Sequence, residues 1–428
     1  MKITRRIPYL LLLSTALLLQ NNVKAQNNQT VNSSLTRVVN TAVPFLRIVP
    51  DARGGGMGDV GIATSVDPNT TFYNASKLAF AKRKLGLSLS YAPWLRALGI
   101  TDIYMAHFTG YYKVSRNDVV HTSLKFFSLG NIDFTDASGA SLGSGNPREL
   151  AFDAGYTRRL GKHFALGVAF RYIYSNLASG QNLGSEPIKA GHAFGADLSG
   201  TYNLDMTVGK KKMKANFMTG LALTNLGTKI AYTKNAKEKD FIPSNLGIGL
   251  GFRLQPNKYH EWGIYADFNK LLVPTPRSDD KDSNRIADYK EQSSFKGLFT
   301  SIGDAPGGFK EEMREWTMGI GTEYWYDHIF AVRAGYFLEA KDKGNRKFVS
   351  VGVGVKYSVF GLDFSYLIPT GGQRNPLDNT FRFSLKFDFA KVGGNKTNDE
   401  GDDINDKTDK VDKATRKKLK KGKAATAE

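Results

Sequence analysis

The 428-residue chain contains no cysteine. This absence excludes a disulfide scaffold, a thiolate metal site, a cysteine nucleophile and a lipid anchor on cysteine. After its first 25 residues the chain also lacks long apolar runs, and its mean hydropathy is only −0.34. A bundle of membrane-spanning helices is therefore excluded, because each such helix needs about 20 apolar residues. A β-barrel remains compatible with this composition, since only every second side chain of a barrel strand faces lipid.

The net charge of +19 is not concentrated in one patch. The first 25 residues contribute four of these charges and residues 391–428 contribute three, so +12 is spread along the body of the chain. No basic helix and no recognised nucleic-acid-binding module accompanies the excess. We therefore expect a moderately basic, solvated surface and no nucleic-acid partner.

The N-terminus has the form of an export signal. Arg5 and Arg6 precede an apolar stretch of 13 residues, 7–19, and Val23-Lys24-Ala25 resembles a small-x-small cleavage site. The apolar stretch is too short for a transmembrane anchor, so residues 1–25 are predicted to be a signal peptide. The mature chain is then exported.

Alternation of apolar with small or polar residues recurs through the body of the chain, which is typical of half-buried strands. One example pairs Leu246, Ile248, Leu250, Phe252 and Leu254 with Gly247, Gly249, Gly251 and Arg253. Most of these segments reach the roughly 9–11 residues that a tilted membrane strand needs. The pattern predicts fourteen strands, at 85–94, 101–114, 118–130, 148–160, 163–175, 190–205, 213–227, 243–256, 259–271, 313–325, 328–340, 347–357, 360–368 and 379–389.

The connections between these strands alternate in length. Nearly all even-numbered connections are tight turns such as 161–162 and 257–258, whereas the odd-numbered ones are long and polar. Outer-membrane barrels have this asymmetry, with short periplasmic turns and long extracellular loops, while a soluble β-sandwich has no reason for it. We therefore predict an all-β fold, a 14-stranded antiparallel transmembrane β-barrel over residues 85–389, in the outer membrane of a Gram-negative bacterium. Both termini should be periplasmic, including a charged and disordered tail, 390–428.

Residues 26–84 precede the first strand and do not alternate. A segment of this size can fold back into the lumen, so we predict an N-terminal plug there. The run Gly56-x-Gly58-x-x-Gly61 formally fits a dinucleotide-binding fingerprint, but no strand precedes it and no βαβ unit surrounds it. Glycines suit close backbone packing against a barrel wall instead. The residues assigned to the plug are Arg53, Gly54, Gly55, Gly56, Gly58 and Asn74.

The strand faces expected to point inward carry charges of both signs. We expect these charges to pair with one another or to hold the plug, with ion conduction as the alternative. They are Asp153, Arg171, Asp197, Arg253, Asp267, Glu323, Arg333, Lys356, Arg382 and Lys386. The six histidines are scattered, and neither an HExxH nor a GxSxG motif is present. We therefore expect no catalytic residues, metal site or cofactor, and no enzymatic activity.

Several stretches resemble a known family. The glycine-rich segment 53–61, the stretch 73–80 and the stretch 87–95, which ends in Tyr91-Ala92-Pro93-Trp94-Leu95, are similar to the PorV family. Gly110-Tyr111-Tyr112-Lys113 and 126–130 extend the resemblance, which covers about 44–389. This family belongs to the type IX secretion system of Bacteroidetes, within the FadL-like outer-membrane transporter superfamily. Family members often have Asn-Pro-Ala where this chain has Asn74-Ala75-Ser76.

The resemblance implies a function that the composition alone does not indicate. PorV-like proteins are non-enzymatic carriers, which bind the folded C-terminal signal domain of a secreted cargo at the translocon barrel. They deliver the cargo to a surface attachment complex, where a sortase removes the signal and links the cargo to lipopolysaccharide. The alternative is a FadL-type channel for long-chain fatty acids or other hydrophobic small molecules.

The extracellular loops are the expected binding surface for cargo and translocon, because loops on a rigid scaffold commonly carry function. Trp94, Leu95 and Arg96 occupy the first outer turn, where Trp94 could instead belong to an interfacial aromatic belt. The long loop 272–312 contains apolar side chains that could anchor a partner or could pack inward as a lid. These are Phe295, Leu298, Phe299, Ile302 and Phe309.

Overall fold

A computed structural model describes the chain from residue 38 to residue 389. Within that range the description omits residues 97–98, 137, 179, 184–185, 235, 237, 278–279, 282, 284–285 and 372–379. The expected signal peptide, 1–25, and the expected tail, 390–428, lie outside the described residues. No helix in the described part of the chain is long and apolar enough to cross a membrane.

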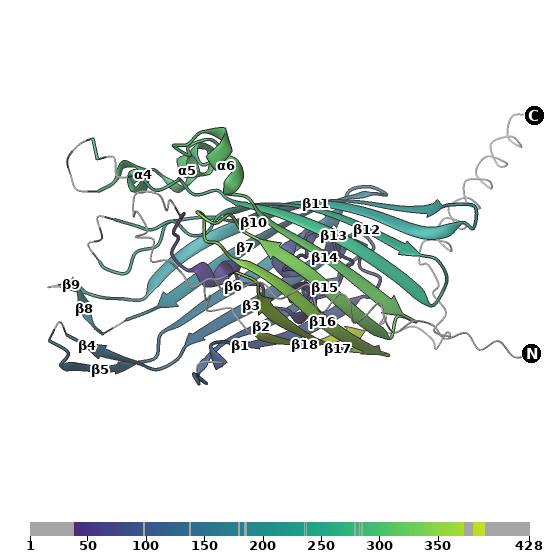
Figure 1. Cartoon of the computed structure of the whole chain (residues 1–428), viewed down its shortest axis with the longest axis horizontal. Coiled ribbons are helices and arrows are strands. Elements are labelled where there is room, and N and C mark those ends of the chain that lie inside the picture. Colours follow the sequence, from purple (N-terminus) through teal and green to yellow (C-terminus); the bar gives the residue numbers. More distant parts are fainter. Residues whose placement is uncertain are drawn as a thin grey trace, which may run out of the picture.

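Fourteen antiparallel strands form a closed barrel (Figure 1), in which β18 pairs with β1 and so leaves no open edge. The fold class predicted from the alternating pattern is therefore confirmed. The barrel strands are β1 (Leu85–Pro93), β2 (Ile103–Lys113), β3 (Asp118–Leu129), β6 (Arg148–Arg159), β7 (Phe164–Asn176), β10 (Gly191–Val208), β11 (Met213–Gly227), β12 (Asn245–Gln255), β13 (His260–Leu271), β14 (Thr317–Tyr326), β15 (Phe330–Leu338), β16 (Lys347–Tyr357), β17 (Phe360–Pro369) and β18 (Phe381–Phe389).

The two ends of the barrel differ in the way the sequence predicted. Turns of two to four residues join the strands at one end, and connections of 8 to 45 residues join them at the other. Two long connections contain small hairpins, β4 (Ile132–Thr135) with β5 (Ser141–Gly145) and β8 (Asn182–Leu183) with β9 (Glu186–Pro187). We call the end with the turns the short-turn end and the opposite end the long-connection end.

The start of one strand was predicted wrongly. The alternating pattern placed residue 313 at the beginning of a strand, but β14 begins at Thr317. Residues Phe309–Arg314 instead form a helix, α6, whose carboxylates Glu311 and Glu312 are buried. Glu311 and Glu312 pair with lysines of the barrel end, and these ion pairs favour the helix over a strand.

Each strand has one outward and one inward face. In β7, the large apolar side chains Phe164, Leu166, Val168 and Phe170 are exposed, whereas the residues that alternate with them are buried. An outward apolar face is suited to lipid. The inward face carries small and charged residues, which leaves room in the lumen for another part of the chain.

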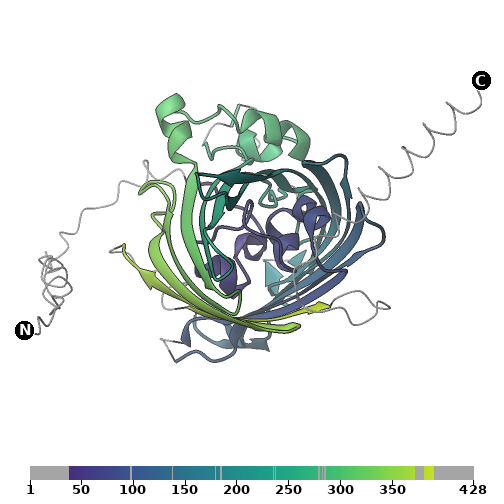
Figure 2. The same cartoon turned by 90° about the vertical axis from the view of Figure 1, so that its right-hand side faces the viewer.

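The residues before β1 occupy that room (Figure 2). They form four short helices, η2 (Pro44–Arg47), α2 (Ala52–Gly55), α3 (Thr70–Tyr73) and η3 (Ala75–Phe80). We call residues 38–84 the luminal segment. The Ala42 N–H donates a 2.9 Å hydrogen bond to the carbonyl of Phe241, in the long connection after β11. The segment therefore enters at the long-connection end and crosses the lumen to reach β1, whereas the sequence suggested that it starts at the short-turn end.

Glycines allow the luminal segment to touch the wall directly. Gly58 has φ +73°, in the left-handed region, and a Cβ there would lie 2.6 Å from the carbonyl oxygen of Tyr336. On the wall, a Cβ at Gly335 would collide with the Met57 carbonyl group, and Gly56 lies against Gly352. Backbone thus packs on backbone, which only residues without a side chain permit.

We predict that Gly335→Ala weakens the barrel. The added methyl group has no space unless the luminal segment shifts, and overpacking of this kind costs about 1–3 kcal/mol. The temperature at which the purified protein loses its compact form on detergent gels should fall. Gly200→Ala is the matched control, because its methyl group would sit 3.4 Å from Leu166 Cδ2 on the outward face. Equal losses in the two variants would contradict this account of the glycines.

Candidate functional site

Buried ion pairs join the luminal segment to the wall. The Arg53 guanidinium donates to both carboxylate oxygens of Glu323, at 2.9 and 2.8 Å. Arg333 Nε donates to the same Glu323 at 2.8 Å, and its Nη1 pairs with Asp363 at 2.8 Å. Lys386 lies 2.5 Å from the second oxygen of Asp363. The charges alternate along this row, so each buried charge has a partner of opposite sign, as a dry interior requires.

Other wall side chains hold other parts of the segment. Arg382 pairs with Asp59 at 3.0 Å, and the Asp267 carboxylate accepts the backbone N–H groups of Gly61 and Ile62 at 2.6 and 2.9 Å. Further along the wall, Arg171 bridges wall carboxylates from β6 and β10. The inward-facing charges predicted from the sequence therefore pair or hold the luminal segment, which confirms that expectation for these residues.

The six residues assigned to the plug all lie in the lumen. Arg53 and the glycines Gly54 and Gly55 belong to α2, while Gly56 and Gly58 follow it. Asn74 ends α3, is 2% exposed, and donates from its amide to Thr201 Oγ1 at 2.9 Å. The fold thus brings these six residues together against the barrel wall. The Asn-Ala-Ser sequence that departs from the family pattern forms the junction of α3 with η3.

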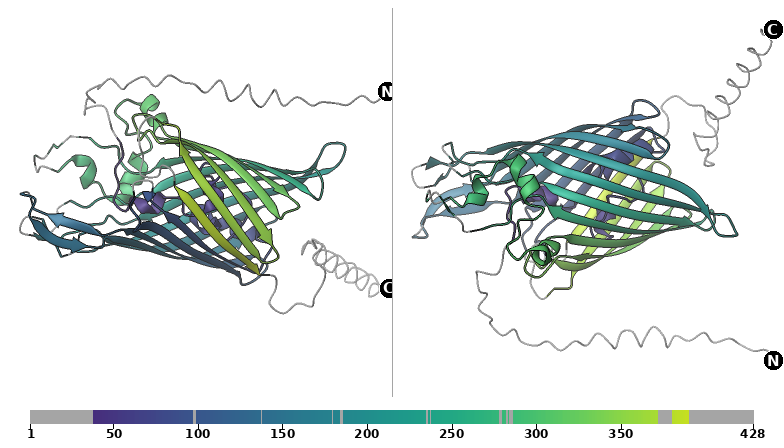
Figure 3. Two further views of the ribbon diagram at one scale, coloured as in Figure 1. Left: turned by 60° about the horizontal axis from the view of Figure 1, so that its bottom comes forward. Right: turned by 90° about the horizontal axis from the view of Figure 1, so that it is seen from above.

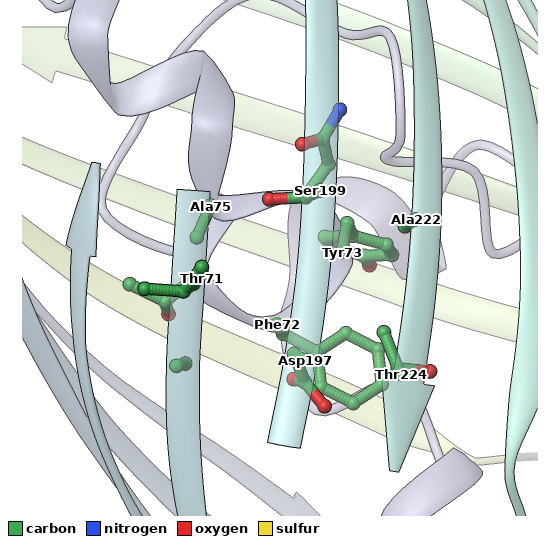
Figure 4. A pocket seen from close by; sticks show the side chains of 11 residues that line it. Thr71, Phe72, Tyr73, Ala75, Asp197, Ser199, Ala222 and Thr224 are labelled. Carbon is green, nitrogen blue, oxygen red and sulfur yellow. The ribbon is translucent and has the colours of Figure 1, made fainter. Parts of the chain in front are cut away.

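A pocket lies between α3 and the wall (Figure 4). Thr71, Phe72 and Tyr73 border it from the luminal segment, while Asp197 and Ser199 border it from β10. Ala222 and Thr224 of β11 also line it. Hydroxyl and carboxylate groups contribute to this lining, so it differs from the continuous apolar route that a long alkyl chain would require.

An apolar layer closes the long-connection end of the lumen. Phe45 of η2 is fully buried and stacks on Phe127, with 6.5 Å between ring centroids. Trp94 meets the same Phe127 ring edge-on at 5.1 Å. The partners contributed by the other strands and connections are Met105, Ile173, Ile230, Ile242, Phe337, Phe348 and Leu367.

The expectation that Trp94 is an exposed anchor or a belt residue is wrong. Its side chain is only 9% exposed and belongs to the apolar layer. Leu95 is half-buried against that layer, and Arg96 alone of this trio is exposed. The alternation in β1 predicts this burial, because Trp94 has the same parity as the inward-facing residues Ser90 and Ala92.

The connection from β13 to β14 carries a group of helices outside the barrel wall. They are α4 (Asp288–Glu291), α5 (Ser294–Thr300) and α6 (Phe309–Arg314), drawn in green at the long-connection end (Figures 1 and 2). Phe295, Phe299, Ile302 and Phe309 are 72%, 62%, 58% and 80% exposed, and Leu298 is half-buried. These four side chains therefore do not pack inward as a lid.

We call Phe295, Phe299, Ile302, Phe309 and Met313 the aromatic cap. Phe295 and Phe299 contact each other edge to face, with 5.1 Å between centroids. Met313 is 52% exposed and was not anticipated from the sequence, although it stands four residues after Phe309, the spacing of helical neighbours. Exposed apolar groups of this kind mark interaction surfaces.

An ionic clamp fixes α6 to the barrel end. Lys270, next to the end of β13, lies 2.6 Å from both Glu312 and Glu315. Lys343, in the connection after β15, pairs with Glu311 at 2.8 Å and with Glu315 at 2.9 Å. All five side chains are less than one-tenth exposed. Burial alone would raise the pKa of Glu315, but the hydrogen bonds from Lys270 and Lys343 hold it below its ordinary value.

We predict that Lys343→Gln loosens α6. Removing one partner from a buried ion pair leaves unpaired carboxylates and costs about 3–5 kcal/mol. Tryptic cleavage between β13 and β14 should accelerate by at least about tenfold, because local opening exposes the peptide bonds. The exposed Lys341 is the control position, so Lys341→Gln should leave cleavage unchanged. An unchanged rate in Lys343→Gln would show that the clamp does not hold the helix.

We predict that lowering the pH loosens α6 in the wild-type chain. Because the folded-state pKa of Glu315 is depressed, its stabilising contribution is present above the ordinary glutamate pKa. It is lost as the pH falls through the lower folded-state value. Cleavage by an acid-tolerant protease should therefore increase between β13 and β14 as the pH falls below the ordinary glutamate range, while the barrel stays closed.

Comparison with known proteins identifies the family. The family model described as "Type IX secretion system protein PorV" matches residues 30–278, which is more than half of the chain. Comparison with curated proteins gives no match.

Solved structures of similar shape are distant in sequence. The chain is similar to the P. putida toluene transporter TodX, with 12% identity, a TM-score of 0.46 and coverage of 80% of this chain and 99% of that chain. It is also similar to a Pseudomonas aeruginosa FadL homologue, with 10% identity, a TM-score of 0.39 and coverage of 82% and 99%. The family match over residues 30–278, together with the closed barrel, identifies the chain as a member of the PorV family and an outer-membrane component of the type IX secretion system.

Proposed function

We propose that this chain carries secreted proteins. It binds the folded C-terminal signal domain of a cargo protein at the type IX translocon barrel and brings the cargo to the attachment complex on the cell surface. There a sortase removes the signal domain and links the cargo to lipopolysaccharide. The chain itself catalyses no reaction. The aromatic cap is the observation that supports this proposal most directly.

The cap has the properties of a binding surface. Exposed phenylalanines have an unfavourable interaction with water, and burying such anchors under a partner provides most of the binding energy of many interfaces. The ionic clamp holds α6 in one place, so less conformational entropy is lost when a partner binds. In this proposal the long-connection end is extracellular, where cargo leaves the translocon.

The filled lumen fits a carrier better than an uptake channel. We infer that residues 26–84 act as a plug, in which Arg53, Gly54–Gly58 and Asn74 attach the chain to the wall. The ion-pair row and the apolar layer occupy successive levels of the barrel, so the interior serves as a rigid support for the connections.

The alternative is a FadL-type channel for long-chain fatty acids or other hydrophobic small molecules. Such a channel needs an apolar route past the luminal segment, where Arg53, Glu323 and Asp363 lie instead. We predict that deleting the gene leaves uptake of a labelled long-chain fatty acid unchanged. Reduced uptake that the wild-type gene restores would favour the channel.

The carrier proposal predicts a cargo defect when the cap is made polar. In the variant Phe295→Ser, Phe299→Ser, Phe309→Ser and Met313→Ser, the barrel should insert normally, because none of these side chains supports the wall. Cargo should remain unattached, with its signal domain uncleaved, because the apolar anchors are gone. Immunoblots of cell fractions measure both quantities, and copurification from detergent measures bound cargo and translocon.

The matched control replaces exposed apolar residues in a different long connection. Ile132 and Leu142, in the β4–β5 hairpin, are 40% and 53% exposed. Ile132→Ser with Leu142→Ser should leave cargo processing intact. Normal processing in the cap variant would place the binding surface elsewhere, and normal processing in a strain that lacks the gene would reject the carrier proposal itself.

A further inference from the structure

The β10–β11 hairpin extends past its neighbours at the short-turn end (Figures 1 and 3). β10 pairs with β7 only as far as Tyr202, and one more hydrogen bond joins the Asn203 N–H to the carbonyl of His163 at 2.7 Å. The pairing of β10 with β11 continues to Val208. The last five residues of β10, 204–208, therefore have a partner strand on one side only.

This part of β10 has an open edge. Successive residues of a strand point their backbone N–H and C=O groups to opposite sides. Because the N–H group of Asn203 points toward β7, the N–H groups of Asp205 and Thr207 point to the same side, past the end of β7. Such an edge can accept a hydrogen-bonding segment from elsewhere.

Four lysines lie at or beside the tip of this hairpin, namely Lys210, Lys211, Lys212 and Lys214. All four side chains are exposed, and none forms a hydrogen bond, an ion pair or a ring contact within the described part of the chain. The only acidic residue of 203–214 is Asp205, which already accepts a 2.7 Å hydrogen bond from the Asn216 amide. The hairpin tip therefore has a concentrated positive charge that no nearby carboxylate balances.

Other basic residues at the short-turn end are already engaged. Arg158 pairs with Asp118 at 3.3 Å. The Lys84 ammonium lies 5.1 Å from the centroid of the Tyr112 ring. Among the described residues of this end, the hairpin thus has the largest group of exposed ammonium groups without a partner.

The chain itself contains a complementary acidic stretch. Residues 399–406 include five carboxylates and no basic residue. They follow β18, which ends at the short-turn end, and they lie outside the described residues. The acidic stretch therefore leaves the barrel at the end where the hairpin lysines lie.

The intervening chain is long enough to reach the hairpin. In the circular order of the fourteen strands, β11 is seven positions from β18 in either direction, so the hairpin lies across the barrel from the end of β18. Strands about 4.8 Å apart and tilted by about 40° give a barrel of this size a width of about 28 Å. The chain from residue 389 to residue 399 can extend to about 34 Å.

We propose that the acidic stretch 399–406 docks on the β10–β11 hairpin, beside its four lysines and along the open edge of β10. Residues 390–398 then cross the short-turn end of the barrel. Charge complementarity and reach favour this occupant, and the open edge offers it backbone N–H donors. A single exposed ion pair contributes little, so docking depends on several pairs acting together. The inference is independent of the carrier proposal, because the aromatic cap lies at the other end.

The absence of cysteine allows a direct distance measurement in the full-length protein. Thr207→Cys in the hairpin and Ile404→Cys in the acidic stretch carry spin labels, and pulsed electron paramagnetic resonance measures the distance between them in phosphatidylcholine membranes. We expect a narrow distribution centred below about 25 Å, because adjacent segments lie about 5 Å apart and each label adds several ångströms. In 1 M salt, where the screening length falls to about 3 Å, the distribution should broaden and move to longer distances.

Charge reversal on either side of the contact should have the same effect as salt. The hairpin variant is Lys210→Glu, Lys211→Glu and Lys212→Glu. The acidic-stretch variant is Asp399→Lys, Glu400→Lys, Asp402→Lys, Asp403→Lys and Asp406→Lys. Each variant alone should lose the narrow distribution, and their combination should restore it. The acidic-stretch variant changes no residue of the barrel, so it tests the contact even if the hairpin variant fails to fold.

The matched control reverses three other charges at the same end, with Lys82→Glu, Arg83→Glu and Lys258→Glu, and it should keep the narrow distribution. A broad distribution in the otherwise wild-type chain, or an equal loss in the hairpin variant and the control, would overturn the proposal. So would a narrow distribution that disappears when phosphatidylglycerol replaces phosphatidylcholine, because the lysines would then bind anionic lipid in preference to the acidic stretch.

Discussion

The pairing of Arg53 with Glu323 is the contact on which the rest of the interior depends. A barrel of fourteen strands encloses more space than its own inward side chains fill, so another part of the chain must occupy it. That part brings a guanidinium into a region from which water is largely excluded, and an unpaired charge there would be strongly destabilising. Glu323 lies between Arg53 and Arg333 and pairs with both, and Asp363 in turn pairs with Arg333 and Lys386, so that opposite charges alternate along the row.

Glycine makes this pairing possible. Charged side chains of the wall can reach the luminal segment only if its backbone lies close to the strands, and Gly56, Gly58 and Gly335 permit that approach. The abundance of glycine and the mixture of charges in the composition thus have one physical origin. Both follow from filling a wide barrel with a folded segment that is attached by backbone contact and by ion pairs.

The same interior supports the long connections. The apolar layer joins the luminal segment to the connections, since Ile230 and Ile242 of one connection belong to the same buried cluster as Phe45. The ionic clamp then joins α6 to the end of β13 and to the connection after β15. A surface that has to present phenylalanines to a partner without collapsing needs a firm base, and the barrel end provides it.

Much of the barrel could be predicted from the sequence, because alternation is a local signal that repeats in every strand. Even the burial of Trp94 follows from the alternation in β1, which the residue continues, although its place in the first outer turn suggested exposure. The helices α4 to α6 could not be predicted. They have four to seven residues each, and α6 depends on Lys270 and Lys343, which are distant in the sequence. The direction in which the luminal segment crosses the barrel could not be predicted from the sequence either, since it depends on contacts such as that between Ala42 and Phe241.

The passage of the luminal segment from one end of the barrel to the other constrains the order of assembly. The Ala52 N–H donates to Ser384 Oγ across 332 positions of the chain, so this contact forms only after the last strand has been made. Once β18 has paired with β1, the wall is continuous and the segment would have to be threaded through it lengthwise. The strands must therefore wrap around the segment before the final seam closes. A premature seam would produce a kinetic trap: a barrel with correct strand pairing, an empty centre and the early part of the chain left outside.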